Sequence, residues 1–178
     1  MDAAGIERRS PGIHAALLSE PAIDLLATRE GDGSLLIQSR RGRARLHLAG
    51  EVLQYTVEQG DPFGYPLLPA VLHPDEALQH TVDTQYPDGL YQLAHLFSSP
   101  RAGDIVVSAT SGYDLRDRYE IPEHKASHGS LHRDHMFVPL ATNCPLADRL
   151  IRTVDVFPTL LTAMGRATPK GIDGRTAM

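Results

Sequence analysis

Hydrophobic and polar positions alternate over short distances in the first part of the chain. Apolar or alternating runs at residues 23–28, 35–39, 44–49 and 52–58 predict four β-strands. Glycine-containing breaks separate these runs, at 31–33, 41–42 and 50–51, and favour three hairpin turns. Before them, Pro11 and the helical spacing of apolar residues up to Ser19 predict a short helix. The pattern therefore predicts a helix followed by an antiparallel meander.

A different pattern follows the proline- and glycine-rich segment 60–69, which marks the junction. Helices are predicted at 74–82, at 89–97 and at 155–164, the last with Asp155 as N-cap and ending at Gly165. The continuous β-branched run at 105–109 predicts a strand buried on both faces of a sheet, and 138–141 is a second, shorter strand candidate. The second part is therefore predicted to have α/β character.

Composition excludes several classes of protein. With 178 residues and 42% hydrophobic residues, the chain can bury a core, and its net charge of −5 gives no basic surface for nucleic acid or an anionic membrane. No apolar run reaches 18 residues, and the single cysteine, Cys144, excludes an intrachain disulfide and fits a reducing compartment. We therefore expect a cytoplasmic protein that binds neither nucleic acid nor membrane.

One basic run stands out, the four arginines between residues 40 and 45 around Gly42. We interpret it as an arginine-rich β-turn, because charge clusters of this kind are commonly solvated. A contact with an anion or a polynucleotide is the alternative, although no aromatic residue is interleaved with the arginines.

Four of the nine histidines lie within twelve residues, at positions 124, 128, 132 and 135. Because neutral imidazole is a common metal ligand, this density suggests a metal site. The spacing of four would place His124, His128 and His132 on one face of a helix, but Pro122 and Gly129 favour a loop. Each histidine is then judged singly, and an ordinary surface histidine is the alternative.

Three ordered motifs carry a family resemblance. They are Ser-His-Gly-Ser at 127–130 followed by Val-Pro-Leu at 138–140, Thr-Val-Asp-x-x-Pro-Thr-Leu at 153–160, and Gly-Ile-Asp-Gly-Arg at 171–175. Together they resemble the C-terminal end of the alkaline phosphatase superfamily, in its type I phosphodiesterase/nucleotide pyrophosphatase branch. The resemblance implies a partial alkaline-phosphatase-like α/β sheet with an antiparallel β-meander insert. Residues 1–64 would be the insert or cap region, and 65–178 the C-terminal part of the catalytic domain.

The resemblance also implies a chemistry. His128 matches the last histidine of a two-metal centre, usually zinc, that acts on a phosphate or sulfate ester, and Asp134 or a backbone carbonyl would orient its ring. His124, Lys125, His132 and Arg133 are candidates to contact the substrate or to support the residues that do. Tyr113, Asp114 and Arg116 follow the strand at 105–109, where binding groups and plain structural turns both occur.

The family's other motifs are not found in this sequence. A Thr or Ser nucleophile after a metal-binding Asp, an Asp-x-x-x-His pair and an Asp-His-Gly motif would all precede His128, whereas the Asp134-His135 pair follows it. No catalytic residue is therefore assigned, and one ligand is fewer than the three that a catalytic zinc usually has. We expect the C-terminal part of a metal-dependent phosphoric ester hydrolase that needs a separate N-terminal catalytic segment.

The alternative is a truncated, catalytically inactive binding or interaction module. Such a module would keep the C-terminal scaffold and associate through an exposed sheet edge, for example as a homo-oligomer.

Overall fold

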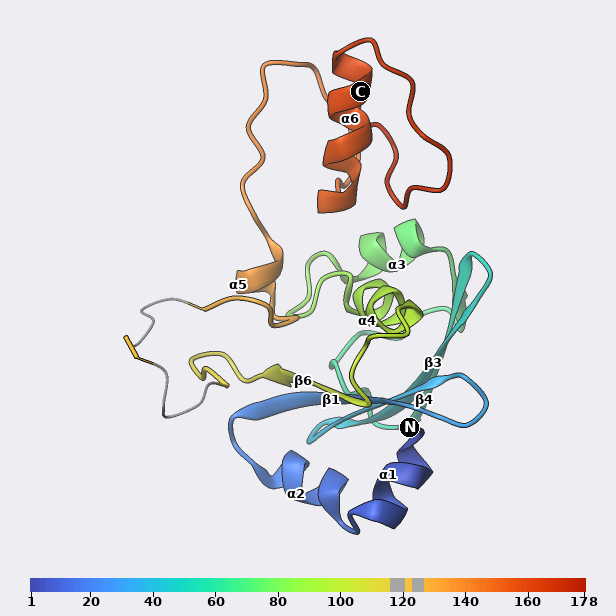
Figure 1. The fold of residues 1–178 in the computed structure, drawn as a ribbon, viewed down its shortest axis with the longest axis vertical. Coiled ribbons are helices and arrows are strands. Elements are labelled where there is room, and N and C mark those ends of the chain that lie inside the picture. Colours follow the sequence, from blue (N-terminus) through green and yellow to red (C-terminus); the bar gives the residue numbers. More distant parts are fainter. Residues whose placement is uncertain (116–120, 123–126) are drawn as a thin grey trace. The chain divides into compact units, whose positions relative to one another are not determined.

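The computed structural model describes residues 1–115, 121–122 and 127–178. Within these residues the chain forms two compact units, Met1–Phe137 and Val138–Met178. The first unit contains all six strands of one sheet together with the helices that cover it (Figure 1).

The sheet is antiparallel throughout. Its strands are β1 (Ile23–Arg29), β2 (Leu35–Ser39), β3 (Gly42–Ala49), β4 (Val52–Gln59), β5 (Val71–Leu72) and β6 (Ile105–Ala109). They lie in the order β5-β4-β3-β2-β1-β6, and every neighbouring pair is antiparallel. The predicted four-stranded meander and its three hairpins are therefore confirmed.

Helices cover both faces of the sheet. In Figure 1, α1 (Ala3–Arg9) and α2 (Ile13–Ser19) lie on one side, and α3 (Pro74–Thr81) and α4 (Gly89–Ser98) lie on the other. The helices predicted in the regions of α2, α3 and α4 are confirmed, whereas α1 was not predicted. Its N-cap is Asp2, whose carboxylate accepts a hydrogen bond from the backbone N–H of Gly5 at 2.8 Å.

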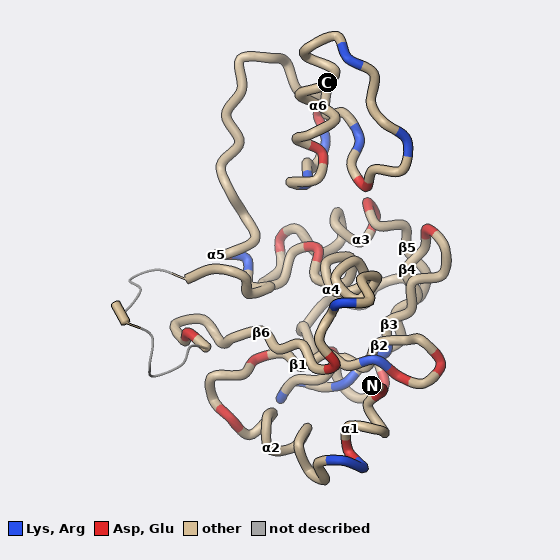
Figure 2. The backbone as a smooth tube through the Cα atoms, viewed as in Figure 1, with Lys and Arg blue, Asp and Glu red and all other residues tan. Residues whose placement is uncertain are grey.

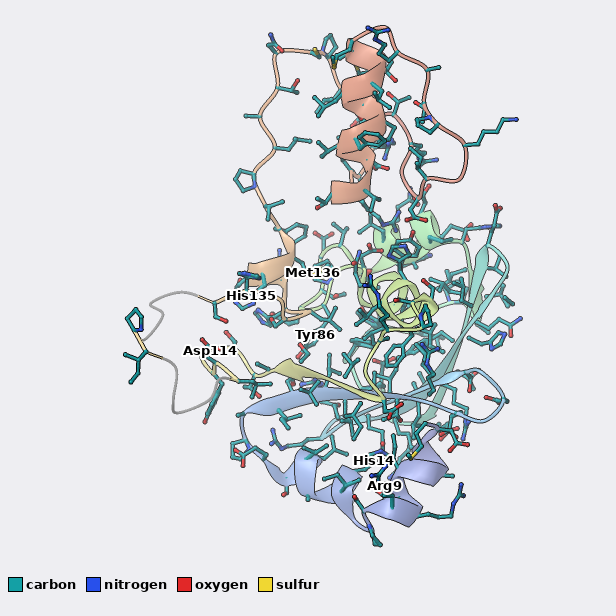
Figure 3. All side chains as sticks on the ribbon, in the orientation of Figure 1. Arg9, His14, Tyr86, Asp114, His135 and Met136 are labelled. Atoms are coloured by element: carbon teal, nitrogen blue, oxygen red, sulfur yellow. The ribbon has the colours of Figure 1, made fainter. Side chains whose placement is uncertain are left out.

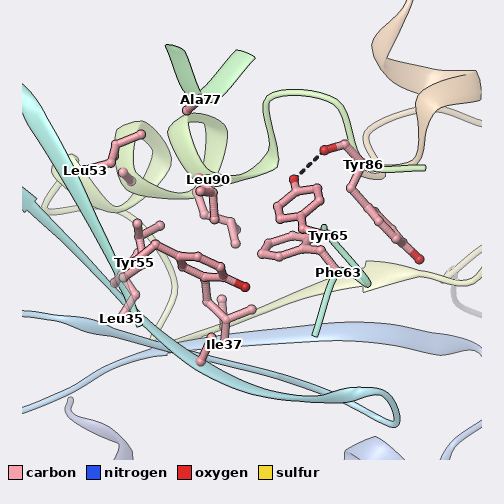
Figure 4. Close-up of a cluster of buried hydrophobic side chains, with 14 of the residues drawn as sticks. Leu35, Ile37, Leu53, Tyr55, Phe63, Tyr65, Ala77, Tyr86 and Leu90 are labelled. Atoms are coloured by element: carbon pink, nitrogen blue, oxygen red, sulfur yellow. Dashed lines mark hydrogen bonds between the residues drawn. The ribbon is translucent and has the colours of Figure 1, made fainter. Parts of the chain in front are cut away.

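The main core fills the space between the sheet and the helix pair α3 and α4 (Figure 4). It contains a group of aromatic rings, in which Phe63 and Tyr65 stack with their centroids 4.7 Å apart. The Tyr65 hydroxyl donates to the backbone carbonyl of Tyr86, which satisfies a polar group inside the core. The buried members of the core are Leu25, Ala27, Leu35, Ile37, Ala44, Leu46, Leu53, Tyr55, Phe63, Tyr65, Leu72, Ala77, Tyr86, Leu90, Leu93, Ala94 and Phe97.

Two strand predictions need correction. β6 is not buried on both faces of the sheet, because only Ser108 of its five residues is buried. In the described chain it pairs with β1 alone, at the edge of the sheet. Residues 138–141 form no strand, because the described residues offer them no hydrogen-bonded neighbour, and Val138 and Leu140 are exposed.

The division into units also differs from the predicted one. Strands β5 and β6 come after residue 64, yet they belong to the same sheet as β1 to β4. The compact units separate after Phe137 instead.

The second unit is organised around Asp155. A short 3-10 helix, η1 (Thr153–Asp155), leads into α6 (Val156–Ala163), and Gly165 follows with a left-handed φ of 64°. Asp155 occupies the predicted N-cap position, but its carboxylate does not bond the first turn of α6. It accepts from the backbone N–H groups of Arg152 (3.1 Å) and Arg175 (3.0 Å) and from the Arg149 guanidinium (2.8 Å).

None of the helices that the structure describes is both long enough and apolar enough to span a bilayer.

Candidate functional site

The histidine-rich segment is anchored to the first unit just before its last short helix. The backbone N–H of Leu131 donates to the Ser108 hydroxyl on β6 at 3.0 Å, and the N–H of Arg133 donates to the carbonyl of Gln85 at 2.8 Å. Leu131 also packs against the main core. These contacts fix the start of α5 (Arg133–Met136) next to the end of β6.

A cleft of about 300 Å³ lies between this segment and the chain that leaves β6. Figure 3 labels one residue from each side, Asp114 after β6 and His135 on α5. Most of the lining residues have polar side chains, with three serines, two histidines, a threonine, a tyrosine and an aspartate. The lining residues are Ala109, Thr110, Ser111, Gly112, Tyr113, Asp114, Ser127, Ser130, His132 and His135.

The two cleft histidines have the same hydrogen-bond arrangement. Nδ1 of His135 accepts from the backbone N–H of Ser130 at 3.4 Å, and Nδ1 of His132 accepts from the backbone N–H of Asp134 at 3.4 Å. A neutral imidazole whose Nδ1 accepts carries its hydrogen on Nε2. His135 therefore has an Nε2–H donor. His132 has one in the tautomer whose Nδ1 accepts, although the Asp134 carboxylate, 3.2 Å away, competes for that atom. The described residues provide no partner for either Nε2 atom.

A polar network that includes the buried residue Tyr86 lies behind His132. Its ring packs edge-on against Tyr86, with centroids 6.0 Å apart and planes at 88°. The Tyr86 hydroxyl donates to Asp24 at 2.5 Å, and Arg41 pairs with the same carboxylate at 2.9 Å. Burial, followed by the hydrogen bond to Asp24, raises the pKa of Tyr86 to about 12. Tyr86 is therefore a neutral phenol at physiological pH and supports the ring of His132 by packing.

Some of the predicted site residues line the cleft and others do not. His128 is exposed on the loop, and its neighbours Ser127 and Ser130 line the cleft while His128 does not. His132 lines the cleft, and its Nδ1 lies 3.2 Å from a carboxylate oxygen of Asp134, so this aspartate contacts His132. His124 and Lys125 lie outside the described residues, as does Arg116.

Arg133, a candidate to contact the substrate or to support the residues that do, has contacts within the first unit. Its guanidinium donates to the carbonyls of Asp83 (3.4 Å) and Thr84 (3.5 Å), and its central carbon lies 5.4 Å from the centroid of the Phe137 ring. These contacts hold α5 against the segment that precedes α4.

The described residues alone do not fit a catalytic zinc. They contain no group of three His, Cys, Asp or Glu side chains placed to hold a metal ion, whereas such an ion usually takes three protein ligands. A complete centre at His128 would therefore need ligands from beyond the described part of the chain.

The arginine-rich run forms the turn between β2 and β3, where a second hollow of about 360 Å³ is lined by Arg40, Arg41 and Arg43. Basic and acidic positions both occur along the strands of the first unit (Figure 2). Arg43 and Arg45 both pair with Glu58, at 2.7 and 2.5 Å, while Arg41 pairs with Asp24 as described above. These partners support the interpretation of an arginine-rich turn whose cations are used within the fold.

Sequence reasoning placed Tyr113 and Asp114 on the loop that leaves β6, and both line the cleft. It missed the role of Tyr86, since nothing in the sequence connects this residue to a histidine so far along the chain. It also treated His135 as an ordinary surface histidine, and the signal that identifies it is the position of its ring beside Ser130.

The comparisons with known proteins give no match: no family model, no curated protein and no solved structure resembles this chain closely enough to be reported.

Proposed function

We propose that this chain is the C-terminal part of a metal-dependent phosphoric ester hydrolase of the phosphodiesterase/nucleotide pyrophosphatase type, and that His128 is its last zinc ligand. The observation that carries the proposal is the exposed imidazole of His128, on a loop whose two neighbouring serines line a polar cleft. An exposed ring can reach an ion without first breaking contacts in the fold. The motif resemblance over residues 127–175 supports the same assignment.

In this proposal, this chain and an N-terminal catalytic segment each supply part of the active site. This chain would supply one zinc ligand and the polar cleft beside it, which would hold the phosphate or sulfate ester. The nucleophile and the remaining ligands would come from an N-terminal catalytic segment, because the described residues contain no complete ligand set. No bond-making step is therefore assigned to the residues of this chain.

The test uses the chain together with any coding sequence that lies in frame upstream of Met1. Bound zinc is measured by elemental analysis, and activity by release of nitrophenol from bis(p-nitrophenyl) phosphate. His128→Ala is expected to lower the zinc content and to reduce turnover roughly 100-fold, the scale of losing a group that holds a catalytic metal. His80→Ala, an exposed histidine on α3, is the matched control and should leave both unchanged. The proposal fails if the unsubstituted protein binds no more zinc than His128→Ala and releases no nitrophenol.

The second candidate is an inactive interaction module, and the position of β6 favours it. β6 has one partner, β1, among the described residues, and it carries three β-branched residues in a row, Ile105, Val106 and Val107. An apolar edge strand is a template for pairing with another chain. A concentration-dependent dimer that Val107→Lys converts to monomer, in a protein that binds no zinc, would favour this module over the hydrolase.

A further inference from the structure

The cleft between the end of β6 and α5 contains several hydrogen-bond donors that do not depend on a metal. Two of its groups are the Nε2–H donors of His132 and His135 described above. Its wall also contains the hydroxyls of Ser111 and Ser127, to which the described residues give no hydrogen-bond partner, and that of Ser130. A volume of about 300 Å³ exceeds what one tetrahedral anion requires, so the rest of an ester has room beside it.

The positions of the two rings are set before any ligand arrives. The Nδ1 atom of each ring accepts from a backbone N–H group, and Tyr86 packs against the ring of His132. Donors that are already oriented lose little conformational entropy when they bind a ligand. The arrangement therefore favours a small ligand with several acceptor oxygens.

We propose that this cleft binds the tetrahedral oxyanion of a phosphate or sulfate group, with the Nε2–H group of His135 as its main donor and that of His132, in the tautomer that carries it, as a second donor. The choice of a phosphoryl or sulfuryl group rests on the proposed function, whereas the donors and the cleft do not. When either imidazole is protonated, its positive charge adds to the attraction for an anion.

The carboxylates around the cleft weaken its attraction for an anion. Asp134 lies beside Nδ1 of His132, at 3.2 Å, and Asp114 belongs to the opposite wall. Both carboxylates oppose an anion, and the one on Asp114 lies in the lining itself. Asp24 and Arg41 lie behind Tyr86 and pair with each other, so their charges largely cancel. The site is therefore expected to be weak in this chain alone, and removal of the Asp114 charge should strengthen it.

The experiment follows the imidazole nitrogens by NMR while inorganic phosphate is added to the full chain at pH 7 with a chelator and no zinc. Sodium chloride at matched ionic strength is the reference titration. We expect saturable shifts at His132 and His135 with phosphate and not with chloride. His135→Ala should weaken phosphate binding roughly fivefold, the scale of one lost hydrogen bond to an anion, and Asp114→Asn should strengthen it roughly threefold. His80→Ala serves as the matched control and should leave the affinity unchanged.

A parallel titration with sodium sulfate distinguishes the two sources of the oxyanion, and saturable binding of either supports the proposal. The proposal is overturned if phosphate and sulfate shift the histidine signals no more than chloride does, or if His135→Ala binds as well as His80→Ala. Because zinc is absent throughout, such a result leaves the assignment of His128 standing. Conversely, a failure of zinc binding at His128 leaves an observed oxyanion site intact.

Discussion

At the scale of single residues, the carboxylate of Asp155 connects three segments of the second unit. It is 5% exposed, and it accepts from the guanidinium of Arg149 and from two backbone N–H groups, those of Arg152 and Arg175. Removing the charge from such a group leaves the partly buried guanidinium of Arg149, whose side chain is 19% exposed, without its carboxylate partner. Asp155→Asn is therefore expected to destabilise Val138–Met178 by about 3 kcal/mol.

The measurement for this variant is hydrogen exchange of the Arg175 and Ala177 amides, whose N–H groups are bonded to Asp155 and Thr159. Asp148→Asn, at an exposed carboxylate nearby in sequence, is the control and should leave both rates unchanged. Equal exchange rates in the two variants would contradict the central role of Asp155.

The same carboxylate predicts a loss of stability in acid. Burial alone would raise the pKa of Asp155, but the Arg175 N–H, the Arg149 guanidinium and the Arg152 N–H together hold it below its ordinary value of 3.8. A carboxyl group with a lowered folded pKa stabilises the fold above its unfolded pKa, and this contribution is lost as the pH falls through the folded pKa. Protection of the Arg175 amide should therefore be constant down to about pH 4 and fall below it, and Asp155→Asn should not show this fall.

Tyr86 predicts the opposite pH dependence in the first unit. Burial and the bond to Asp24 raise its pKa from 10.0 to about 12, so its contribution is complete below pH 10 and is lost as the pH rises toward 12. Tyr86→Phe should lower the free energy of unfolding by about 1 kcal/mol at pH 7, measured in urea, and should reduce the decline between pH 10 and 12. Tyr113→Phe is the matched control, because the Tyr113 ring is about half exposed. Identical alkaline curves for the two variants would refute the assignment.

The candidate site was partly predictable from these residues. The Ser-His-Gly-Ser motif identified His128 and its serines, and the end of a strand identified Tyr113 and Asp114, because both signals are local in sequence. The packing of Tyr86 against His132 and the hydrogen bond between Ser130 and His135 depend on how distant segments fold together. No spacing in the sequence encodes these contacts.

At the scale of elements, the sequence predicted best where turn chemistry and alternation agreed. Strands β1 to β4 were found because glycine-containing turns separate runs of suitable length. β6 was identified as a strand but was given the wrong position, because β-branched residues occur in a row both in central strands and in this edge strand. Helix α1 was missed because its N-cap, Asp2, precedes a segment with few apolar residues.

The contact between the start of β3 and the end of β4 gives a prediction at this scale. A Cβ atom on Gly42 would lie 2.2 Å from the carbonyl oxygen of Gly60, which is backbone and cannot turn aside. Gly50, at the β3–β4 turn, has a φ of 63° and open space around its Cβ position. Gly42→Ala should therefore cost about 3 kcal/mol through a clash, and Gly50→Ala only about 1 kcal/mol through left-handed backbone strain.

Urea unfolding of the two alanine variants compares these costs directly. Gly50→Asn separates strain from steric hindrance, since Asn tolerates the left-handed region better than Ala. A smaller loss for Gly42→Ala than for Gly50→Ala would show that the β3 and β4 backbones are not in close contact at this point.

At the scale of the whole molecule, the two units differ in how much they bury. Every residue of the main core lies before Phe137, and so do all six strands. In the described Val138–Met178 segment the buried residues are Asp155, Pro158 and Ala177. The core of the first unit is therefore complete without the second.

This difference predicts that residues 1–137 fold when the rest of the chain is removed. The truncated chain should unfold in urea in one cooperative transition. Its free energy of unfolding should lie within about 1 kcal/mol of that of the first unit in the full chain, because a change in stability requires a change in buried contacts. Far-UV circular dichroism measures the transition, and hydrogen exchange of the Leu131 amide, which is bonded to Ser108, reports whether the cleft segment keeps this contact.

A further truncation after residue 104 serves as the opposite control. It removes β6 from the side of β1 and exposes the buried residues Leu25 and Ala27 along their pairing edge. If 1–137 lacks a cooperative transition, the first unit depends on residues after Phe137 and the division into two compact units does not describe its stability.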